Sequence, residues 1–183
     1  MKSNWLTLNR TVLAWSVLCG SVLAEPAASH ITAKVELENS TSYKNIAGST
    51  AHAKEQTRQL CVTLDNRDKQ AATDVSVKWA IFAHKMETNK LVTVKEGRVK
   101  ARIEGLATAT LKSDKVVIKG TPTHSVVTHK TVGGKAHNST KNEPAAGEEY
   151  YGYSVAVYVG SVLIQEISSQ PNLKAQSTPV NNP

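Results

Sequence analysis

The sequence has little of several features that would point to chemistry or to aromatic recognition. Only two cysteines occur, Cys19 and Cys61, and aromatic residues make up 5% of the chain. These numbers disfavour both a disulfide-stapled fold and an aromatic platform for stacked sugars or bases. A G-x-S-x-G elbow is absent, and Gly133-Gly134-Lys135 lacks the other residues of a phosphate-binding loop. We therefore expect a protein that is not an enzyme and holds no cofactor.

Metal-binding and acid–base patterns are also missing. His124 and His129 are five residues apart, which places them on opposite faces of a continuous strand. Glu148 and Glu149 are adjacent and would point apart. A cupredoxin-type copper site needs Cys, His and Met close together late in the chain, whereas Cys61 lies early. No metal site is predicted.

The first 24 residues are typical of a secretory signal peptide. Lys2 and Arg10 give a positive start, residues 11–23 form a short apolar run, and Ala24 stands at a suitable cleavage position. The run is shorter than a typical membrane span, and we predict no transmembrane span after cleavage. The expected location is secreted, periplasmic or outer envelope. A retained N-terminal anchor is the alternative. Cleavage would leave Cys61 as a free thiol, either reactive toward a partner or an inert strand residue.

Residues 58–82 carry the clearest structural pattern. Leu60, Val62 and Leu64 alternate with polar or small residues, and a second alternating set follows a polar turn at residues 65–73: Val75, Val77, Trp79 and Ile81. Alternation with period two puts each set on one face of a strand. The pattern predicts two strands of an all-β domain with Trp79 in its core.

The rest of the chain is interpreted as further strands separated by loops. Strands are predicted at residues 31–38, 91–96, 98–104, 110–119, 125–130, 150–159 and 162–168. Residues 39–54 are predicted as a long loop and residues 131–149 as a mobile excursion, while Gly97 is expected at a bulge or bend. The domain organisation is thus a signal at 1–24, one sandwich domain at 25–170 and a disordered tail at 171–183.

The alternating pattern resembles that of immunoglobulin-like β-sandwiches of exported bacterial proteins. The resemblance lies in Leu60-x-Val62-x-Leu64-Asp65-Asn66, in Asp74-Val75-x-Val77-x-Trp79, and in a late hairpin around Gly160. It implies a single sandwich of about 7–9 antiparallel strands in which Trp79 fills the core. The disulfide that often accompanies such a tryptophan is absent. The resemblance also suggests a role in adhesion or assembly.

One cationic surface stands out. Arg98, Lys100 and Arg102 alternate with apolar residues on one predicted strand, and Lys78 joins them if its strand lies nearby. The formal net charge of the chain is +7, which suits an acidic partner. The functional hypothesis is an anion- or partner-binding stripe. The alternative is an edge strand that its charges protect from aggregation.

The late tyrosines form the one aromatic cluster. Tyr151, Tyr153, Val155, Val157 and Val159 are predicted to share one face, and the cluster is expected to pack between the sheets with one hydroxyl bonded to backbone. From these observations we expect a non-enzymatic binding or assembly module of the cell envelope. Its contact surface would be the cationic strand or residues 131–149, and its partner an envelope or extracellular protein or an anionic glycan, not a specific nucleic acid. The alternative is a small-ligand carrier or an accessory subunit of an envelope enzyme.

Overall fold

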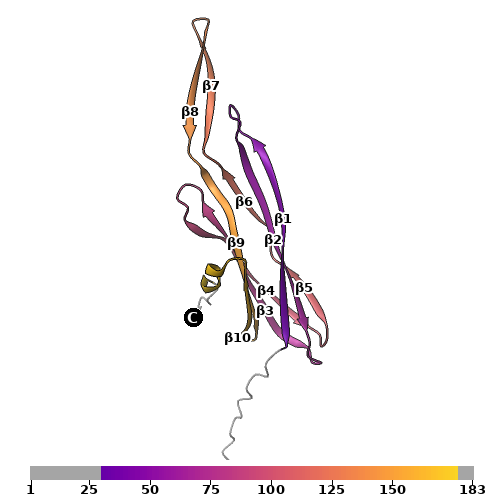
Figure 1. Ribbon diagram of the computed structural model, residues 1–183. Helices are drawn as coiled ribbons and strands as arrows, with labels where there is room; N and C mark the ends of the chain where they lie inside the picture. The colour runs from indigo at the N-terminus through magenta and orange to yellow at the C-terminus, as the bar shows by residue number, and fades with distance from the viewer. Residues whose placement is uncertain (1–29, 177–183) are drawn as a thin grey trace, which may run out of the picture.

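The computed structural model describes residues 30–176, so the predicted signal peptide and the residues after 176 lie outside the described part. Figure 1 shows an elongated all-β molecule with a narrow two-stranded projection at one end. The elements are β1 (Ile31–Asn45), β2 (His52–Asn66), β3 (Ala72–Lys85), β4 (Leu91–Ile103), β5 (Thr108–Lys112), β6 (Val116–Thr121), β7 (His124–Val132), β8 (Lys135–Glu143), β9 (Ala146–Val159), β10 (Val162–Ser168) and the 3-10 helix η1 (Pro171–Gln176).

The body of the molecule is an antiparallel sandwich, as predicted. One layer has β2 paired with β1 on one side and with β5 and β6 on the other, and the second layer has the order β4-β3-β9-β10. The layers join where Gly120 and Thr121 of β6 pair with Gly147 and Ala146 of β9. This is the strand order of an immunoglobulin-type sandwich, A-B-E against C′-C-F-G, with β5 and β6 together in the place of strand E. The body has eight strands, within the predicted range, and the projection adds two.

The core lies between these two layers and confirms the predicted alternation. Leu60 and Leu64 of β2 and Ile81 of β3 are fully buried, and Trp79 on β3 is 5% exposed. They belong to one apolar cluster that also takes Val155 and Val157 from β9. Side chains of a strand alternate between its two faces, so one apolar set per strand is enough to fill the interior.

The connection between β2 and β3 is a polar turn, as expected, and Asn66 organises it. Its amide nitrogen donates to the carbonyl oxygens of Gln70, at 2.9 Å, and Glu104, at 3.1 Å, while its side-chain oxygen accepts from the Asp68 N–H. Asn66 is 1% exposed. A buried amide that finds partners on both its nitrogen and its oxygen fixes the turn without leaving an unpaired polar group.

Gly97 has a different role from the predicted bulge. It pairs regularly with Trp79 in the ladder between β3 and β4, and the two irregularities of that ladder lie between Ala72 and Val75 and between Ile81 and Phe82. A Cβ atom on Gly97 would stand 2.6 Å from Cζ2 of Trp79. The glycine is therefore needed because the indole ring lies directly against its backbone.

A bulge in β9 corrects the predicted face of the tyrosines. Phe82 pairs with Gly152, but Ala83 pairs with Tyr150, so Tyr151 is the extra residue. An extra residue switches the side-chain alternation. As a result Tyr150 and Tyr153 pack against the main core, whereas Tyr151 lies with Phe82 and Leu173 on the outer face of the layer. The Tyr151 hydroxyl bonds the side chain of Asn172, not a backbone group.

Two segments that we predicted as loops are paired strands. Residues 39–45 of β1 continue the ladder with residues 52–58 of β2, so the predicted 39–54 loop is reduced to a short turn. Residues 131–149 are not a mobile excursion, because β7 and β8 pair along nine residues each around a Gly133-Gly134 turn. Both glycines have positive φ, 58° and 78°, which is the backbone of a tight two-residue hairpin.

The first six residues of the predicted disordered tail are ordered. Residues 171–176 form η1, and Leu173 is fully buried against Phe82 and Ala80 on the outer face of the β3–β9 layer. One buried leucine is enough to hold a short 3-10 turn on the sheet. Residues 177–183 lie outside the described part of the chain.

Candidate partner-binding surfaces

The four cationic residues predicted as a contact stripe do lie together. In the register of β3 and β4, Lys78 stands opposite Arg98 and Ser76 opposite Lys100, so these side chains share the outer face of the layer. Arg102 follows two residues farther along β4, and β4 is the edge strand of its layer. The structure therefore places Lys78 beside Arg98, Lys100 and Arg102, and these four residues are called the cationic stripe.

Most of these cations already have partners on the protein. Arg98 donates to the Ser76 hydroxyl at 2.8 Å, and the Arg102 side chain contacts Glu104 at 2.8 Å. The Lys78 ammonium lies 5.1 Å from the centre of the Tyr158 ring, a cation–π distance. Among the described residues Lys100 makes no ion pair. Such internal contacts suit an edge strand that is covered by its own charges, and the contact role of this stripe stays a prediction.

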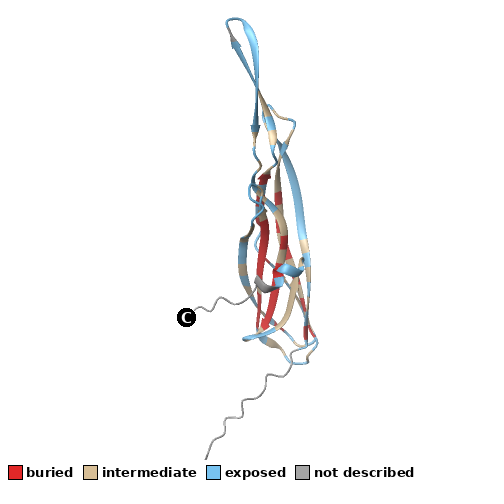
Figure 2. Ribbon diagram, turned by 60° about the vertical axis from the view of Figure 1, so that its left-hand side comes forward, coloured by how far each residue is buried: buried red, intermediate tan, exposed pale blue. Residues whose placement is uncertain are grey.

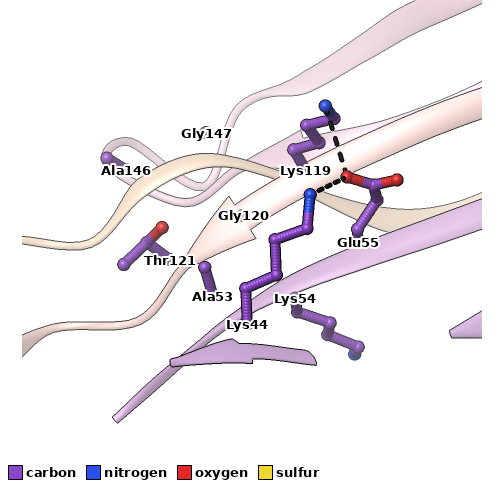
Figure 3. A pocket seen from close by; sticks show the side chains of 9 residues that line it. All are labelled: Lys44, Ala53, Lys54, Glu55, Lys119, Gly120, Thr121, Ala146 and Gly147. Carbon is purple, nitrogen blue, oxygen red and sulfur yellow. Dashed lines mark hydrogen bonds and ion pairs between the residues drawn. The ribbon is translucent and has the colours of Figure 1, made fainter. Parts of the chain in front are cut away.

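A second charged region lies where the β1–β2 hairpin meets β6 and β9. Figure 3 shows the lysines of β1 and β6, Lys44 and Lys119, converging on Glu55 of β2, at 3.3 and 3.2 Å. The hydrogen bonds from Lys119 and Lys44 hold the pKa of the Glu55 carboxyl below its usual value. Lys44, Glu55 and Lys119 help to line a pocket with a volume of about 350 Å³. Glu55 offsets one of the two positive charges of Lys44 and Lys119, and Glu149 pairs with Lys54 at 3.0 Å. Because each of these lysines already has a carboxylate partner, the geometry favours a structural contact, the Glu55 clasp, over a ligand site.

A neighbouring pocket of about 320 Å³ shares Lys54 and Gly120 with the first. Tyr43, His52 and Met86 contribute to its lining, together with Glu148 and Glu149. The two glutamates differ in their surroundings: Glu149 is exposed and pairs with Lys54, while Glu148 is half-buried.

Sequence reasoning missed a buried cation, Arg58. It lies on the inward face of β2, is 7% exposed, and donates to the carbonyl oxygens of Ser40 and Thr57 at 3.2 and 3.0 Å. Its guanidinium sits 4.8 Å from the ring centre of Tyr150. Burial raises the pKa of the Tyr150 hydroxyl, and the charge of Arg58 opposes that rise. The sequence signal for this burial was the spacing of Gln56, Arg58 and Leu60, because residues two apart on a strand share one face.

Cys61 and the histidines offer no assembled site. Cys61 is a free thiol on the outward face of β2, half-buried between Glu36 of β1 and Lys112 of β5. No group of three or more His, Cys, Asp or Glu residues suited to a metal ion occurs within residues 30–176. His129, which we weighed as a ligand, instead lies 2.7 Å from the side-chain oxygen of Asn138.

The most distinctive surface is the β7–β8 ribbon, defined as residues 124–143. It projects beyond the sandwich in Figure 1, and Figure 2 shows it as exposed over most of its length. Residues 128–131 and 133–142 are all exposed. At its base the Val127 N–H donates to the Gly48 carbonyl oxygen at 2.8 Å, which ties the ribbon to the tip of the β1–β2 hairpin. Beyond this point each ribbon strand is paired on one side only.

Comparison with known proteins gives only distant structural matches and no family. No family model matches the chain, and no curated protein matches it. A crystal structure from Akkermansia muciniphila is similar over 82% of this chain and 77% of its own, with 10% identity and a TM-score of 0.31. A Northeast Structural Genomics Consortium target, SoR45, is similar over 60% and 83% respectively, with 14% identity and a TM-score of 0.22. The function therefore has to be inferred from the geometry.

Within residues 30–176, no helix is long and apolar enough to span a bilayer.

Proposed function

We propose that this chain is a non-enzymatic binding or assembly module, exported to the cell envelope or beyond, that contacts its partner through the β7–β8 ribbon. The observation that carries the proposal is the ribbon itself, with residues 128–131 and 133–142 exposed. A projecting element of this kind contributes nothing to a packed core. Its side chains and its unpaired backbone edges are instead available to another molecule.

The backbone of the ribbon suggests how a partner would bind. An isolated two-stranded hairpin is marginally stable in water, and each of its strands keeps a row of N–H and C=O groups on its free edge. A partner that adds a strand or lies along the ribbon would satisfy these groups and stabilise the hairpin at the same time. Binding and ordering would then reinforce each other.

The alternative role as a small-ligand carrier has weaker support. Ligand sites in carriers are mostly apolar cavities, but the space between the two layers is filled by Leu60, Val77, Trp79 and their neighbours. The two pockets described above lie outside that space and are rich in charged residues. The cationic stripe on β3 and β4 remains a second candidate contact surface, although three of its four members already contact neighbouring side chains.

Site-specific photo-cross-linking in the native envelope tests the proposal. A photoreactive residue is placed at Thr131 near the ribbon tip, at Arg102 on the stripe, or at Val117, which is 48% exposed on the body. We expect discrete adducts from Thr131 and none from Val117. Adducts from Arg102 with none from Thr131 would move the contact to the stripe. Recovery of the chain from the cytosol alone would contradict export.

A further inference from the structure

The ribbon has two faces of different chemistry. Residues directly opposite each other in an antiparallel pair share a face, and alternate residues along a strand do so too. Lys130 stands opposite His137, and Lys141 opposite Val126. One face therefore collects every residue of the ribbon with a formal charge, namely Lys130, Lys135, Lys141 and Glu143, together with His124 and His137.

The other face is uncharged apart from a single histidine. Its residues are Ser125, Val127, His129, Thr131, Ala136, Asn138, Thr140 and Asn142. The His129 ring lies within hydrogen-bond distance of Asn138. Protection of a free strand edge against aggregation requires charge somewhere on the ribbon, but it does not require the charges to be confined to one face. Their segregation points to a ligand on that face.

In the described part of the chain, the two distal lysines of the charged face lack the ion pairs that several lysines of the body make. Lys44, Lys54, Lys112 and Lys119 of the body each pair with a carboxylate. Within the described chain, Lys130 and Lys135 make no ion pair, and both are exposed. Lys141 contacts Glu143 at 2.7 Å near the ribbon base. The distal part of this face is thus positive and uncompensated.

The spacing of the charges is that of a linear array. Lys135, the Lys130–His137 pair and Lys141 follow one another along the ribbon. At about 3.4 Å per residue, six positions separate the first from the last, roughly 20 Å. Thr128 and Ser139 lie between the Lys130 pair and Lys141 on the same face and are exposed, so one pair of hydroxyl groups separates the two groups of cations.

The composition of the ribbon narrows the class of ligand. Residues 124–143 contain no Leu, Ile, Met, Phe, Tyr or Trp. A bilayer surface would need such apolar or aromatic anchors, and single-stranded nucleic acid would need aromatic rings for base stacking. Three lysines are also few for a duplex, whose binding depends on many phosphate contacts. An extended ligand with spaced charges and many hydroxyl groups fits better.

We propose that the charged face of the ribbon binds a linear anionic polysaccharide, through its carboxylate or sulfate groups, with Lys130, Lys135 and Lys141 as the principal contacts. This inference rests on the proposed function, because it names the ligand class of the same ribbon. Coulombic contacts between exposed groups weaken as salt screens them, so the binding is salt-dependent.

The test measures fluorescence anisotropy of labelled polygalacturonate and labelled dextran sulfate with the full chain at low salt. The variant K130Q/K135Q/K141Q is expected to bind at least tenfold more weakly. The variant K130R/K135R/K141R keeps the charges and is expected to bind no more than about threefold more weakly than the parent, because Coulombic attraction depends on the charge. Neutral dextran is expected not to bind.

A matched control separates the face from the overall charge. The variant K69Q/K90Q/K115Q removes the same charge from three exposed lysines of the body and is expected to bind nearly as well as the parent. Equal losses in both triple variants would overturn the proposal in favour of net charge. Loss only in R98Q/K100Q/R102Q would place the site on the stripe.

Duplex DNA and anionic phosphatidylglycerol vesicles complete the set of probes. Tighter binding of either than of both polysaccharides, lost in K130Q/K135Q/K141Q, would overturn the ligand class. Absence of polysaccharide binding while Thr131 still cross-links to a protein would refute this inference and leave the proposed function standing. Polysaccharide binding without any Thr131 adduct to a protein would support this inference and remove a protein partner.

Discussion

The sandwich body and the β7–β8 ribbon use the same antiparallel backbone pairing and differ in what lies behind it. Leu60, Val77 and Val155 of the body are each buried to 1% exposure or less, whereas ribbon residues 128–131 and 133–142 are exposed. Backbone hydrogen bonds contribute modestly once water is accounted for, and burial of apolar area supplies most of the stability. The body is therefore stable by itself, whereas the ribbon has little apolar burial to stabilise it and leaves its side chains available to another molecule.

The largest expected effect comes from emptying the core of the body. Leu60→Ala removes a fully buried side chain between the layers and is expected to lower the free energy of unfolding by about 2–5 kcal/mol. The matched control is Val117→Ala on β6, where the side chain is 48% exposed, with an expected change within about 0.5 kcal/mol. Urea unfolding followed by tryptophan fluorescence measures both. Equal changes would contradict the position of the core.

A smaller loss is expected at the contact between Gly97 and Trp79. Gly97→Ala would place a methyl group 2.6 Å from the indole ring, an overpacking that costs about 1–3 kcal/mol. Trp79→Phe in the same chain would make room for the methyl group, so the double variant should lose less than the sum of the single losses. Strict additivity in urea unfolding would contradict direct packing of the ring on this glycine.

Removal of the ribbon should change little. Residues 125–142 are replaced by Asn-Gly, which joins His124 and Glu143, and these two already stand opposite each other. The free energy of unfolding of the body is expected to stay within about 1 kcal/mol of the parent, because no described side chain of residues 125–142 belongs to the apolar clusters of the body. Loss of cooperative unfolding in this variant would show that the ribbon is part of the body.

The smallest effect concerns the clasp that holds the β1–β2 hairpin. The pKa of Glu55 is lowered from its usual 4.5 by Lys119 and Lys44. A carboxyl with a lowered pKa stabilises the fold above its usual pKa, and the contribution is lost as the pH falls through the lowered value. We expect the protection factors of the hairpin amides, which are corrected for the pH dependence of intrinsic exchange, to fall below pH 4.5. Glu55→Gln should remove this acid-dependent step, and an unchanged profile would contradict the clasp.

The sandwich body and the exposed β-hairpins also differ in how well the sequence predicts them. In the body, the alternation of Leu60, Val62 and Leu64 predicts the sandwich strand, because one face of β2 is buried and the other is turned to solvent. Residues 125–130 of β7 were predicted as a strand, but residues 39–45 and β8 are exposed on both faces. No apolar alternation marks these two segments, so their pairing with residues 52–58 and with β7 is what makes them strands. Gly133-Gly134 was the available signal, since two adjacent glycines suit a tight hairpin turn.

Two features of the sites depend on tertiary contacts that no pattern reveals. The bulge at Tyr151 reverses the side-chain alternation between Tyr150 and Tyr153, so simple alternation assigned the wrong tyrosine to the core. Arg58 lies on the inward face that its position predicts, but its charge argues for exposure. Only the carbonyl oxygens of Ser40 and Thr57 and the ring of Tyr150 make its burial tolerable. The cationic stripe was predicted from sequence, although its internal contacts were not.

Backbone amide hydrogen exchange on the full chain tests the contrast between the two regions most directly. Opening free energies range from near zero in exposed elements to the global value in a core. The amides of β2, β3 and β9 that bond within the sandwich are expected to exchange only through global unfolding, and those of residues 128–140 orders of magnitude faster. Protection of the ribbon equal to that of β3 would contradict the account.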